Sequence, residues 1–309
     1  MGIATREAYG KALAEYGKDE NIVVLDADLS KSTKTDMFKT KYPERFFNMG
    51  IAEGNMMSVA AGIASTGKTV FASSFAVFAS LRACEQIRNS ICYPNLNVKI
   101  GATHAGISVG EDGASHQAIE DIAVMRSIPN MVVMSPADEV ETKCAIKAAI
   151  DYDGPVYIRL GRLAVEDVFD EATYKFELGK AVTVTESDND CLTIMTTGLM
   201  LQYAVEAAKI MKEEGKNVRV VNFHTIKPID KEIIIKAAKE TGKILTVEEH
   251  NVIGGLGGAV SEVVTESCPV IVKKMGIMDT FGKSGSPKAL LKMYGLTTED
   301  IVKNIKEMI

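Results

Sequence analysis

Short apolar runs alternate with longer amphipathic stretches along the whole chain. The short runs are rich in the residue types of buried strands, and in the first half they lie at residues 22–27, 70–74, 96–101, 131–134 and 155–159. The longer stretches carry apolar residues at helical spacing, at residues 6–16, 53–65, 81–91, 116–125 and 138–152. Because buried strands that alternate with helices form a parallel sheet covered on both faces, this pattern predicts an α/β fold.

The pattern is interrupted between residues 163 and 190, where the chain becomes acidic, aromatic and irregular. A second alternation follows, with strands expected at 192–195, 218–222, 243–247 and 270–272 and helices starting near residues 199, 230 and 257. A chain of 309 residues is long enough for two domains. We therefore predict two consecutive open, mostly parallel sheets with helices on both faces. The predicted bounds are 1–165 for the first domain, 166–189 for a linker and 190–309 for the second domain.

Charge and composition limit the kinds of molecule that this protein is expected to bind and the compartment in which it is expected to work. The formal net charge is −6 and the basic residues form no block, which argues against nucleic acid and against an anionic membrane surface. No apolar run reaches the roughly 20 residues of a membrane span, and the first residues lack the pattern of a signal peptide. The five cysteines are widely spaced and match no metal-binding or disulfide pattern. These features predict a protein of the reducing cytoplasm.

Glu53 is a lone carboxylate in an almost uncharged stretch, residues 48–56, at the expected start of a helix. A buried carboxylate is costly, so it either stays protonated or faces a specific partner. A simpler interpretation is that Glu53 complements the positive end of the helix dipole. The sequence around Glu53 offers no obvious cation to pair with it.

Residues 103–116 form a glycine-rich segment between an expected strand and an expected helix. In open α/β sheets, ligands bind in the crevice beyond the carboxyl ends of the strands. The segment holds two of the four histidines, His104 and His116, with Asp112 between them, and histidine is the natural proton carrier near neutral pH. A purely structural turn capped by Asp112 and Ser115 is the alternative. A zinc site is disfavoured because no third ligand has suitable spacing.

Two further patterns have mainly structural interpretations. Phe71, Phe75 and Phe78 have the spacing of one helix face, so core packing is the simplest explanation, although one ring could stack on a flat heterocycle. The glycine-rich residues 254–258 match neither the dinucleotide-binding nor the Walker pattern, which favours a strand-to-helix turn.

Arg6, Ser32 and Arg162 are candidates for binding an anion. Each of them alone would be interpreted as a surface residue. Guanidinium groups suit phosphate oxygens, so the set predicts a phosphorylated ligand only if the fold brings its members together.

Taken in order, the motifs resemble the pyrimidine-binding half and the C-terminal domain of transketolases, over essentially the whole chain. The matching segments are Gly50-Ile51-Ala52-Glu53, Ala102-Thr103-His104, Gly110-Glu111-Asp112-Gly113-Ala114-Ser115-His116-Gln117, Ser135-Pro136-Ala137-Asp138 and Glu248-Glu249-His250. The Gly-Glu-Asp-Gly-x-x-His segment is specific, whereas Gly-Ile-x-Glu is shared more widely among thiamine-diphosphate enzymes. The chain lacks the Gly-Asp-Gly motif with which full-length transketolases hold magnesium, so it resembles the C-terminal subunit of a split transketolase.

This resemblance implies an activity and an assembly. The activity is reversible transfer of a two-carbon ketol unit from a ketose phosphate to an aldose phosphate, with thiamine diphosphate as the cofactor. A separate N-terminal subunit would supply the diphosphate site and its Mg²⁺, so this chain would be inactive alone. Self-association to a homodimer, and with the partner to an α2β2 tetramer, is also implied.

The resemblance also implies a role for each matched residue. Glu53 would hydrogen-bond N1′ of the cofactor aminopyrimidine and favour its imino tautomer, Phe75 or Phe78 would stack on that ring, and Asp28 would lie near the cofactor at a subunit junction. His116 would contact the reacting centre. The remaining matches would bind substrate, hydroxyls in the case of His104 and Asp112, and the sugar phosphate in the case of Arg6, Ser32 and Arg162.

Other functions stay open at this point. The nearest is the β subunit of another thiamine-diphosphate enzyme, of the deoxyxylulose phosphate synthase or 2-oxo acid dehydrogenase type. A transketolase of pentose catabolism with an unusual phosphosugar is also compatible. From other classes, a non-catalytic scaffold subunit would keep the same fold, and a nicotinamide-dependent oxidoreductase would rest on residues 254–258 alone.

Overall fold

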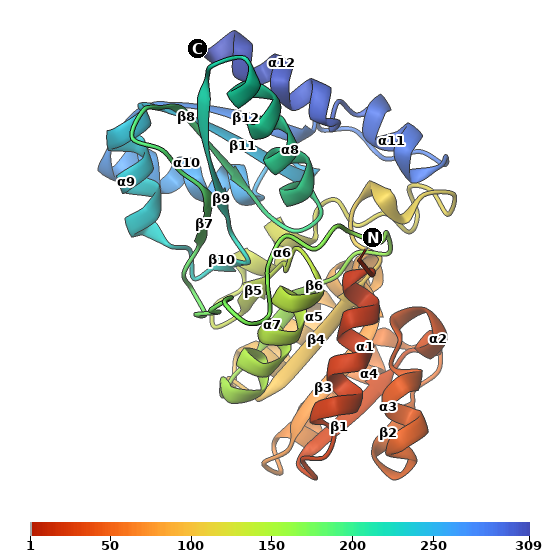
Figure 1. Ribbon diagram of the computed structural model, residues 1–309. Helices are drawn as coiled ribbons and strands as arrows, with labels where there is room; N and C mark the ends of the chain where they lie inside the picture. The colour runs from red at the N-terminus through yellow and green to blue at the C-terminus, as the bar shows by residue number, and fades with distance from the viewer. Residues whose placement is uncertain (1) are drawn as a thin grey trace.

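The computed structural model describes residues 2–309 as two sheets, each with helices on both faces (Figure 1). This arrangement confirms the predicted fold class. The first sheet, in the lower part of Figure 1, has the strand order β10-β5-β6-β4-β3-β1-β2 and is parallel except for β10, which runs antiparallel to β5. Its strands are β1 (Ile22–Asp26), β2 (Phe46–Asn48), β3 (Thr69–Phe75), β4 (Val98–Thr103), β5 (Val132–Met134), β6 (Val156–Arg159) and β10 (Thr225–Lys227).

Helices connect these strands in the way that parallel pairing requires. The α-helices are α1 (Thr5–Tyr16), α2 (Ser30–Thr33), α3 (Asp36–Lys41), α4 (Glu53–Ala64), α5 (Cys84–Gln86), α6 (Asp121–Ser127) and α7 (Glu139–Asp151). Short 3₁₀ turns are η1 (Pro43–Arg45) and η4 (Ile107–Val109), and two π-helical turns, η2 (Phe78–Arg82) and η3 (Ile87–Cys92), flank α5. The helices expected at 6–16, 53–65 and 138–152 are confirmed.

The second sheet has the order β12-β11-β8-β9-β7 and is parallel except for β7, which runs antiparallel to β9. Its strands are β7 (Val182–Thr185), β8 (Asp190–Thr196), β9 (Asn217–Asn222), β11 (Lys243–Asn251) and β12 (Ile271–Ile277). The accompanying helices are α8 (Met200–Glu213), α9 (Lys231–Thr241), α10 (Leu256–Ser267), α11 (Pro287–Met293) and α12 (Thr298–Met308). Across residues 2–309, no helix combines the length and apolar character that a membrane crossing requires.

Two strands that the sequence pattern did not predict connect the two halves of the chain. β7 lies inside the stretch 166–189 and adds an edge to the second sheet. β10 follows β9 in the second half, yet it pairs with β5 and becomes an edge of the first sheet. The domain bounds drawn from the sequence stay a prediction.

The helix expected at 116–125 was placed wrongly, because it begins only at Asp121. Gly113 has φ +73°, and the backbone N–H groups of His116 and Gln117 both donate to the Gly113 carbonyl in a tight turn. A bridge between Ala105 and Ala118 then holds the chain extended. His116 therefore lies on a loop.

The predicted common helix face of the three phenylalanines was also wrong. Phe71 and Phe75 lie on β3, where Phe75 pairs with Thr103 of β4, and Phe78 begins the π-helical turn η2. The apolar run continues as a buried strand through Phe75, so strand pairing prevails over the helical spacing.

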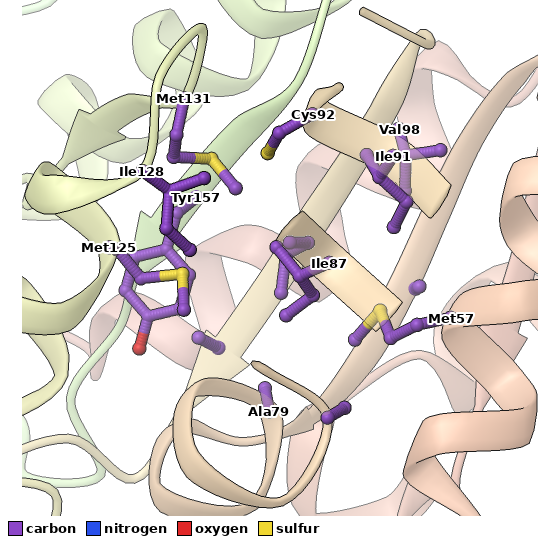
Figure 2. Close-up of a cluster of buried hydrophobic side chains, with 14 of the residues drawn as sticks. Met57, Ala79, Ile87, Ile91, Cys92, Val98, Met125, Ile128, Met131 and Tyr157 are labelled. Atoms are coloured by element: carbon purple, nitrogen blue, oxygen red, sulfur yellow. The ribbon is translucent and has the colours of Figure 1, made fainter. Parts of the chain in front are cut away.

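Alternate residues of the first sheet face two different cores. Leu25, Val70 and Tyr157 pack on the face covered by α4, residues 78–92 and α6 (Figure 2). Val24 and Phe71 pack on the opposite face, which α1, α3 and α7 cover. Because both faces are buried, the strands are apolar at nearly every position, and this explains the uninterrupted apolar runs in the sequence.

A substitution at Ile87 tests the core packing shown in Figure 2. Ile87 is the first residue of η3, and its side chain is fully buried in the core cluster that covers this face of the sheet. Ile87→Val removes one methylene and leaves a small void, so we expect the free energy of unfolding to fall by about 1 kcal/mol. Denaturant titration measures the change, with Ile271→Val as the control, because Ile271 is mostly exposed and its loss should be negligible. Equal losses at both positions would contradict this description of the core.

Candidate active site

The candidate site lies where β1, β3 and β4 of the first sheet end, below the second domain. The loop that follows β4 reaches across to that domain: the Ser108 backbone N–H donates to Glu249 of β11 at 2.5 Å, and the Gln117 side chain donates to the Lys283 carbonyl at 2.9 Å. The carboxyl ends of parallel strands are the usual position of ligand sites in this class of fold. The loop itself carries His104 and His116.

His104 is held at the centre of this region. It follows directly after β4, has φ +58° and is only 3 % exposed. Its ring stacks on Phe75 with centroids 3.8 Å apart. Arg6 Nη1 lies 3.2 Å from Nε2, and Thr103 Oγ1 lies 3.0 Å from Nδ1. Because a guanidinium can only donate, Nε2 accepts from Arg6, and Nδ1 carries the proton and donates to Thr103.

The surroundings keep His104 neutral. Burial lowers the pKa of its imidazole to about 3, and the charges of Arg6, Arg162 and His116 act in the same direction. His104 therefore provides fixed hydrogen bonds over the neutral pH range, and the role of proton carrier suggested by residue type does not suit it.

A neutral, buried His104 should leave a signature in the pH dependence of stability. The folded-state pKa is depressed below the unfolded value of about 6.5, so the stability tied to this group is present above that pH and is lost as pH falls toward 3. His104→Asn removes the titrating group. When the pH is lowered from 7 to 5, the free energy of unfolding of the unmodified chain should therefore fall by about 2 kcal/mol more than that of the variant. Urea titrations at both pH values test this, and a difference that does not change with pH would contradict it.

The fold brings the anion candidates together around His104. Arg6 donates to the Ser32 carbonyl at 2.8 Å, and its buried Nε has no hydrogen-bond partner within residues 2–309. Arg162 donates to the Val109 carbonyl and lies 3.7 Å from the carboxylate of Asp112. Burial, followed by the charge of Arg162, lowers the pKa of Arg6. The two guanidinium groups are therefore close enough to repel each other, and an anion between them would relieve that repulsion.

Glu53 is buried, 1 % exposed, and is the first residue of α4, so it lies at the positive end of the helix dipole as well. Contrary to the impression from the local sequence, it has a cationic partner. Arg82 Nη1 donates to Oε2 at 2.7 Å, from η2 and 29 residues away along the chain. Ser74 Oγ makes a longer contact of 3.4 Å with Oε1.

Phe75 and Phe78 form an aromatic cluster with the two histidines. The rings of Phe75 and Phe78 are nearly parallel, with centroids 5.9 Å apart. One side of Phe75 is covered by His104, whereas Phe78 is only partly buried. His116 meets the Phe78 ring edge-on at 5.3 Å and lies 3.0 Å from Ser115 Oγ. The structure thus joins His104, His116 and both rings in one cluster.

Asp28 lies apart from that cluster. It follows β1 with φ +63°, is exposed, and accepts a hydrogen bond from Asn48 Nδ2 at 2.7 Å. Its position at the surface, on the loop between β1 and α2, leaves its predicted role at a subunit junction open.

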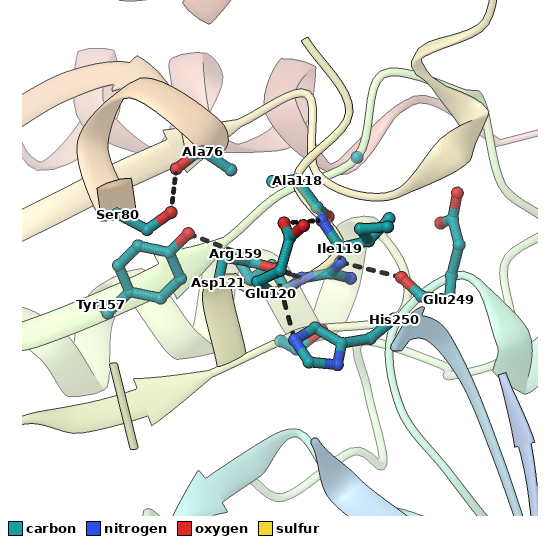
Figure 3. Close-up of polar contacts among 12 residues, drawn as sticks. Ala76, Ser80, Ala118, Ile119, Glu120, Asp121, Tyr157, Arg159, Glu249 and His250 are labelled. Atoms are coloured by element: carbon teal, nitrogen blue, oxygen red, sulfur yellow. Dashed lines mark hydrogen bonds and ion pairs between the residues drawn. The ribbon is translucent and has the colours of Figure 1, made fainter. Parts of the chain in front are cut away.

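A second polar network, which the sequence did not reveal, fixes the loop onto the second domain (Figure 3). Arg159 Nε donates to Asp121 at 2.9 Å, and Tyr157 donates to the same carboxylate at 2.8 Å. Arg159 Nη2 also donates to the carbonyls of Ala118 and Glu249, at 3.2 and 2.9 Å. The network therefore links β6, α6, the loop and β11. The sequence did contain one sign of this network, because Arg159 is a charged residue at the end of an otherwise apolar strand.

Burial is the main cause of the shifted pKa values in the neighbouring segment Glu248-Glu249-His250. It raises the pKa of Glu249 to about 7 and lowers that of His250 to about 4. Glu248 accepts hydrogen bonds from the backbone N–H groups of Leu256 and Gly257. Its carboxylate therefore caps the first turn of α10, which follows the glycine-rich turn. This confirms that residues 254–258 are a strand-to-helix turn.

No group of three or more His, Cys, Asp or Glu side chains among residues 2–309 has an arrangement that could hold a metal ion. The candidate site consists of a buried carboxylate, an aromatic cluster and the two guanidinium groups of Arg6 and Arg162.

Comparison with protein families identifies the class. Residues 1–167 match the family profile of the transketolase pyrimidine-binding domain, and residues 179–301 match that of the transketolase C-terminal domain. This chain belongs to the transketolase family.

Individual relatives agree with this assignment. A putative transketolase C-terminal section of Methanocaldococcus jannaschii is 53 % identical over 98 % of this chain and 95 % of its own length. A 6-deoxy-6-sulfo-D-fructose transketolase subunit of a Clostridium species is 40 % identical over 98 % of this chain and 94 % of its own length. A solved split gene transketolase, described as an inactive β4 tetramer, superimposes with a TM-score of 0.90 at 54 % identity, covering 100 % of this chain and 98 % of the other. Against mammalian transketolases, this chain spans about half of their length.

Proposed function

We propose that this chain is the C-terminal subunit of a split transketolase. With an N-terminal subunit that holds the diphosphate and Mg²⁺, it transfers a two-carbon ketol unit reversibly from a ketose phosphate to an aldose phosphate. The observation that carries the proposal is the buried Glu53 carboxylate, which Arg82 connects to the partly buried ring of Phe78. Relatives named as a C-terminal section and as an inactive β4 tetramer support the need for a partner.

The residues around Glu53 fit the aminopyrimidine of thiamine diphosphate, the cofactor of this family. Arg82 presents a flat, cationic group that donates to Glu53 at 2.7 Å and lies 4.5 Å from the centre of the Phe78 ring. A protonated aminopyrimidine is also flat and hydrogen-bonding, so the same two contacts would suit it. Since His104 already covers one side of Phe75, we assign ring stacking to Phe78. When bound, the cofactor supplies the thiazolium ring as the electron sink of the reaction.

The side chains of this subunit then have distinct roles. Glu53 holds and exchanges a proton at N1′ in a site largely closed to water. Neutral His104 holds substrate hydroxyls, together with Asp112, and His116 on its loop faces the reacting centre. Arg6, Arg162 and Ser32 bind the anionic end of the sugar. The Ser32 carbonyl also holds Arg6 by accepting from its Nη1, and the buried Nε of Arg6 has no partner within residues 2–309. Asp28 is assigned to the subunit junction.

Reconstitution tests this proposal. The chain is purified alone and with its N-terminal subunit, given thiamine diphosphate and Mg²⁺, and assayed with xylulose 5-phosphate and ribose 5-phosphate. We expect transfer by the complex and none by either subunit alone. Parallel assays with 6-deoxy-6-sulfo-D-fructose and with pyruvate distinguish related enzymes. Turnover of pyruvate alone would overturn the transketolase assignment.

A further inference from the structure

Arg82 contacts both the Glu53 carboxylate and the Phe78 ring. Its side chain is 50 % exposed at the end of η2, yet it reaches inward to the almost fully buried Glu53. The guanidinium carbon lies 4.5 Å from the centre of the Phe78 ring while Nη1 lies 2.7 Å from the carboxylate. One flat group therefore occupies the space between the acid and the aromatic ring.

We propose that Arg82 occupies the aminopyrimidine position in the uncomplexed chain and must leave before the cofactor binds. This inference rests on the proposed function, because it takes Glu53 and Phe78 as the pyrimidine contacts. Arg82 is then an autoinhibitory group that keeps the buried carboxylate paired until the N-terminal subunit delivers the cofactor.

Three features support displacement over permanent pairing. The guanidinium and a pyrimidine ring cannot occupy the same space between Glu53 and the Phe78 ring at the same time. Because Arg82 is half-exposed, it has solvent to move into at little cost. It also belongs to a π-helical turn, and a second one, Ile87–Cys92, follows shortly after it. Such turns are irregular and are common at functional sites.

The affinity for the cofactor tests the proposal directly. Calorimetry measures the Kd of thiamine diphosphate, with Mg²⁺ present, for the complex of both subunits. A group that competes for the site weakens the apparent affinity by the fraction of molecules that it blocks, so Arg82→Ala should tighten binding by about three- to tenfold. Arg82→Lys, which keeps the charge but not the flat fork, should tighten it less. Arg88→Ala, at an exposed arginine of the same segment, is the matched control and should leave Kd unchanged.

Unchanged or weaker binding by the Arg82→Ala complex would overturn the inference, since Arg82 would then be neutral or helpful to the bound cofactor. If neither complex binds thiamine diphosphate at all, the proposed function fails instead.

A second measurement uses the chain alone. Arg82→Ala strips the buried Glu53 of its cation and should lower the melting temperature by about 2–4 °C, and adding Glu53→Gln should restore most of that loss. Additive effects of the two substitutions would show that the pair does not form in the uncomplexed chain, which also overturns the inference.

Discussion

Replacing Glu53 by Gln should lower kcat of the reconstituted enzyme by a factor on the order of 10³, the scale of a lost acid–base group. The amide has nearly the shape of the carboxyl group but cannot exchange the proton at N1′. The substitution leaves Arg82 half-exposed, where it can be solvated, so the fold should persist. Steady-state ketol transfer, with thiamine diphosphate at saturation, measures the effect.

The matched control is Glu85→Gln, at an exposed glutamate in the segment that also carries Arg82. It should retain full activity. Glu53→Ala gives a second test without the hydrogen-bonding amide. If either Glu53 variant retained near-normal transfer, the role assigned to this carboxyl would be wrong.

Replacing Arg159 by Met should lower the free energy of unfolding by about 3–5 kcal/mol. Asp121 is fully buried and pairs with Arg159, so the substitution would leave an uncompensated carboxylate inside the protein. It would also remove the donor to the Ala118 and Glu249 carbonyls, which joins the histidine loop to the second domain. Chemical denaturation of the chain measures the loss.

Two further variants separate the buried charge from general packing. Asp121→Asn combined with Arg159→Met should recover part of the stability, because the unpaired charge is then removed as well. Lys209→Ala breaks the exposed pair with Glu206 and should cost less than about 1 kcal/mol. A small loss for Arg159→Met, comparable with that control, would contradict the structural importance of the network.

Much of the fold could be predicted from the sequence because both faces of each sheet are buried. The resulting apolar runs located most strands, and helical spacing located most of the helices between them. Features set by tertiary pairing were not predictable. β10 consists of only three residues, and its partner is β5 in the other half of the chain. The start of α6 was misplaced because a turn at Gly113 and the bridge between Ala105 and Ala118 delay it.

The site was predictable in its residue types but not in its pairings. The sequence placed His104 just after a strand and Glu53 at a helix start, which is where they lie. His116 was expected at a helix start but lies on the loop before α6. That His104 is neutral, with a pKa of about 3, follows from burial and neighbouring arginines that are distant in sequence. Likewise, the partnership of Glu53 with Arg82 depends on how the irregular helix at 78–92 folds back over α4. Such contacts depend on three-dimensional packing that periodicity does not encode.

The central claim is that the carboxyl group of Glu53 serves the aminopyrimidine of a cofactor whose diphosphate is held by another subunit. The most direct test is a crystal structure of this chain with its N-terminal subunit, thiamine diphosphate and Mg²⁺. The account predicts a Glu53 oxygen within about 2.6–3.2 Å of a pyrimidine ring nitrogen, with Arg82 moved away from Phe78. Bound thiamine diphosphate with no carboxyl group of this chain touching its pyrimidine would contradict it.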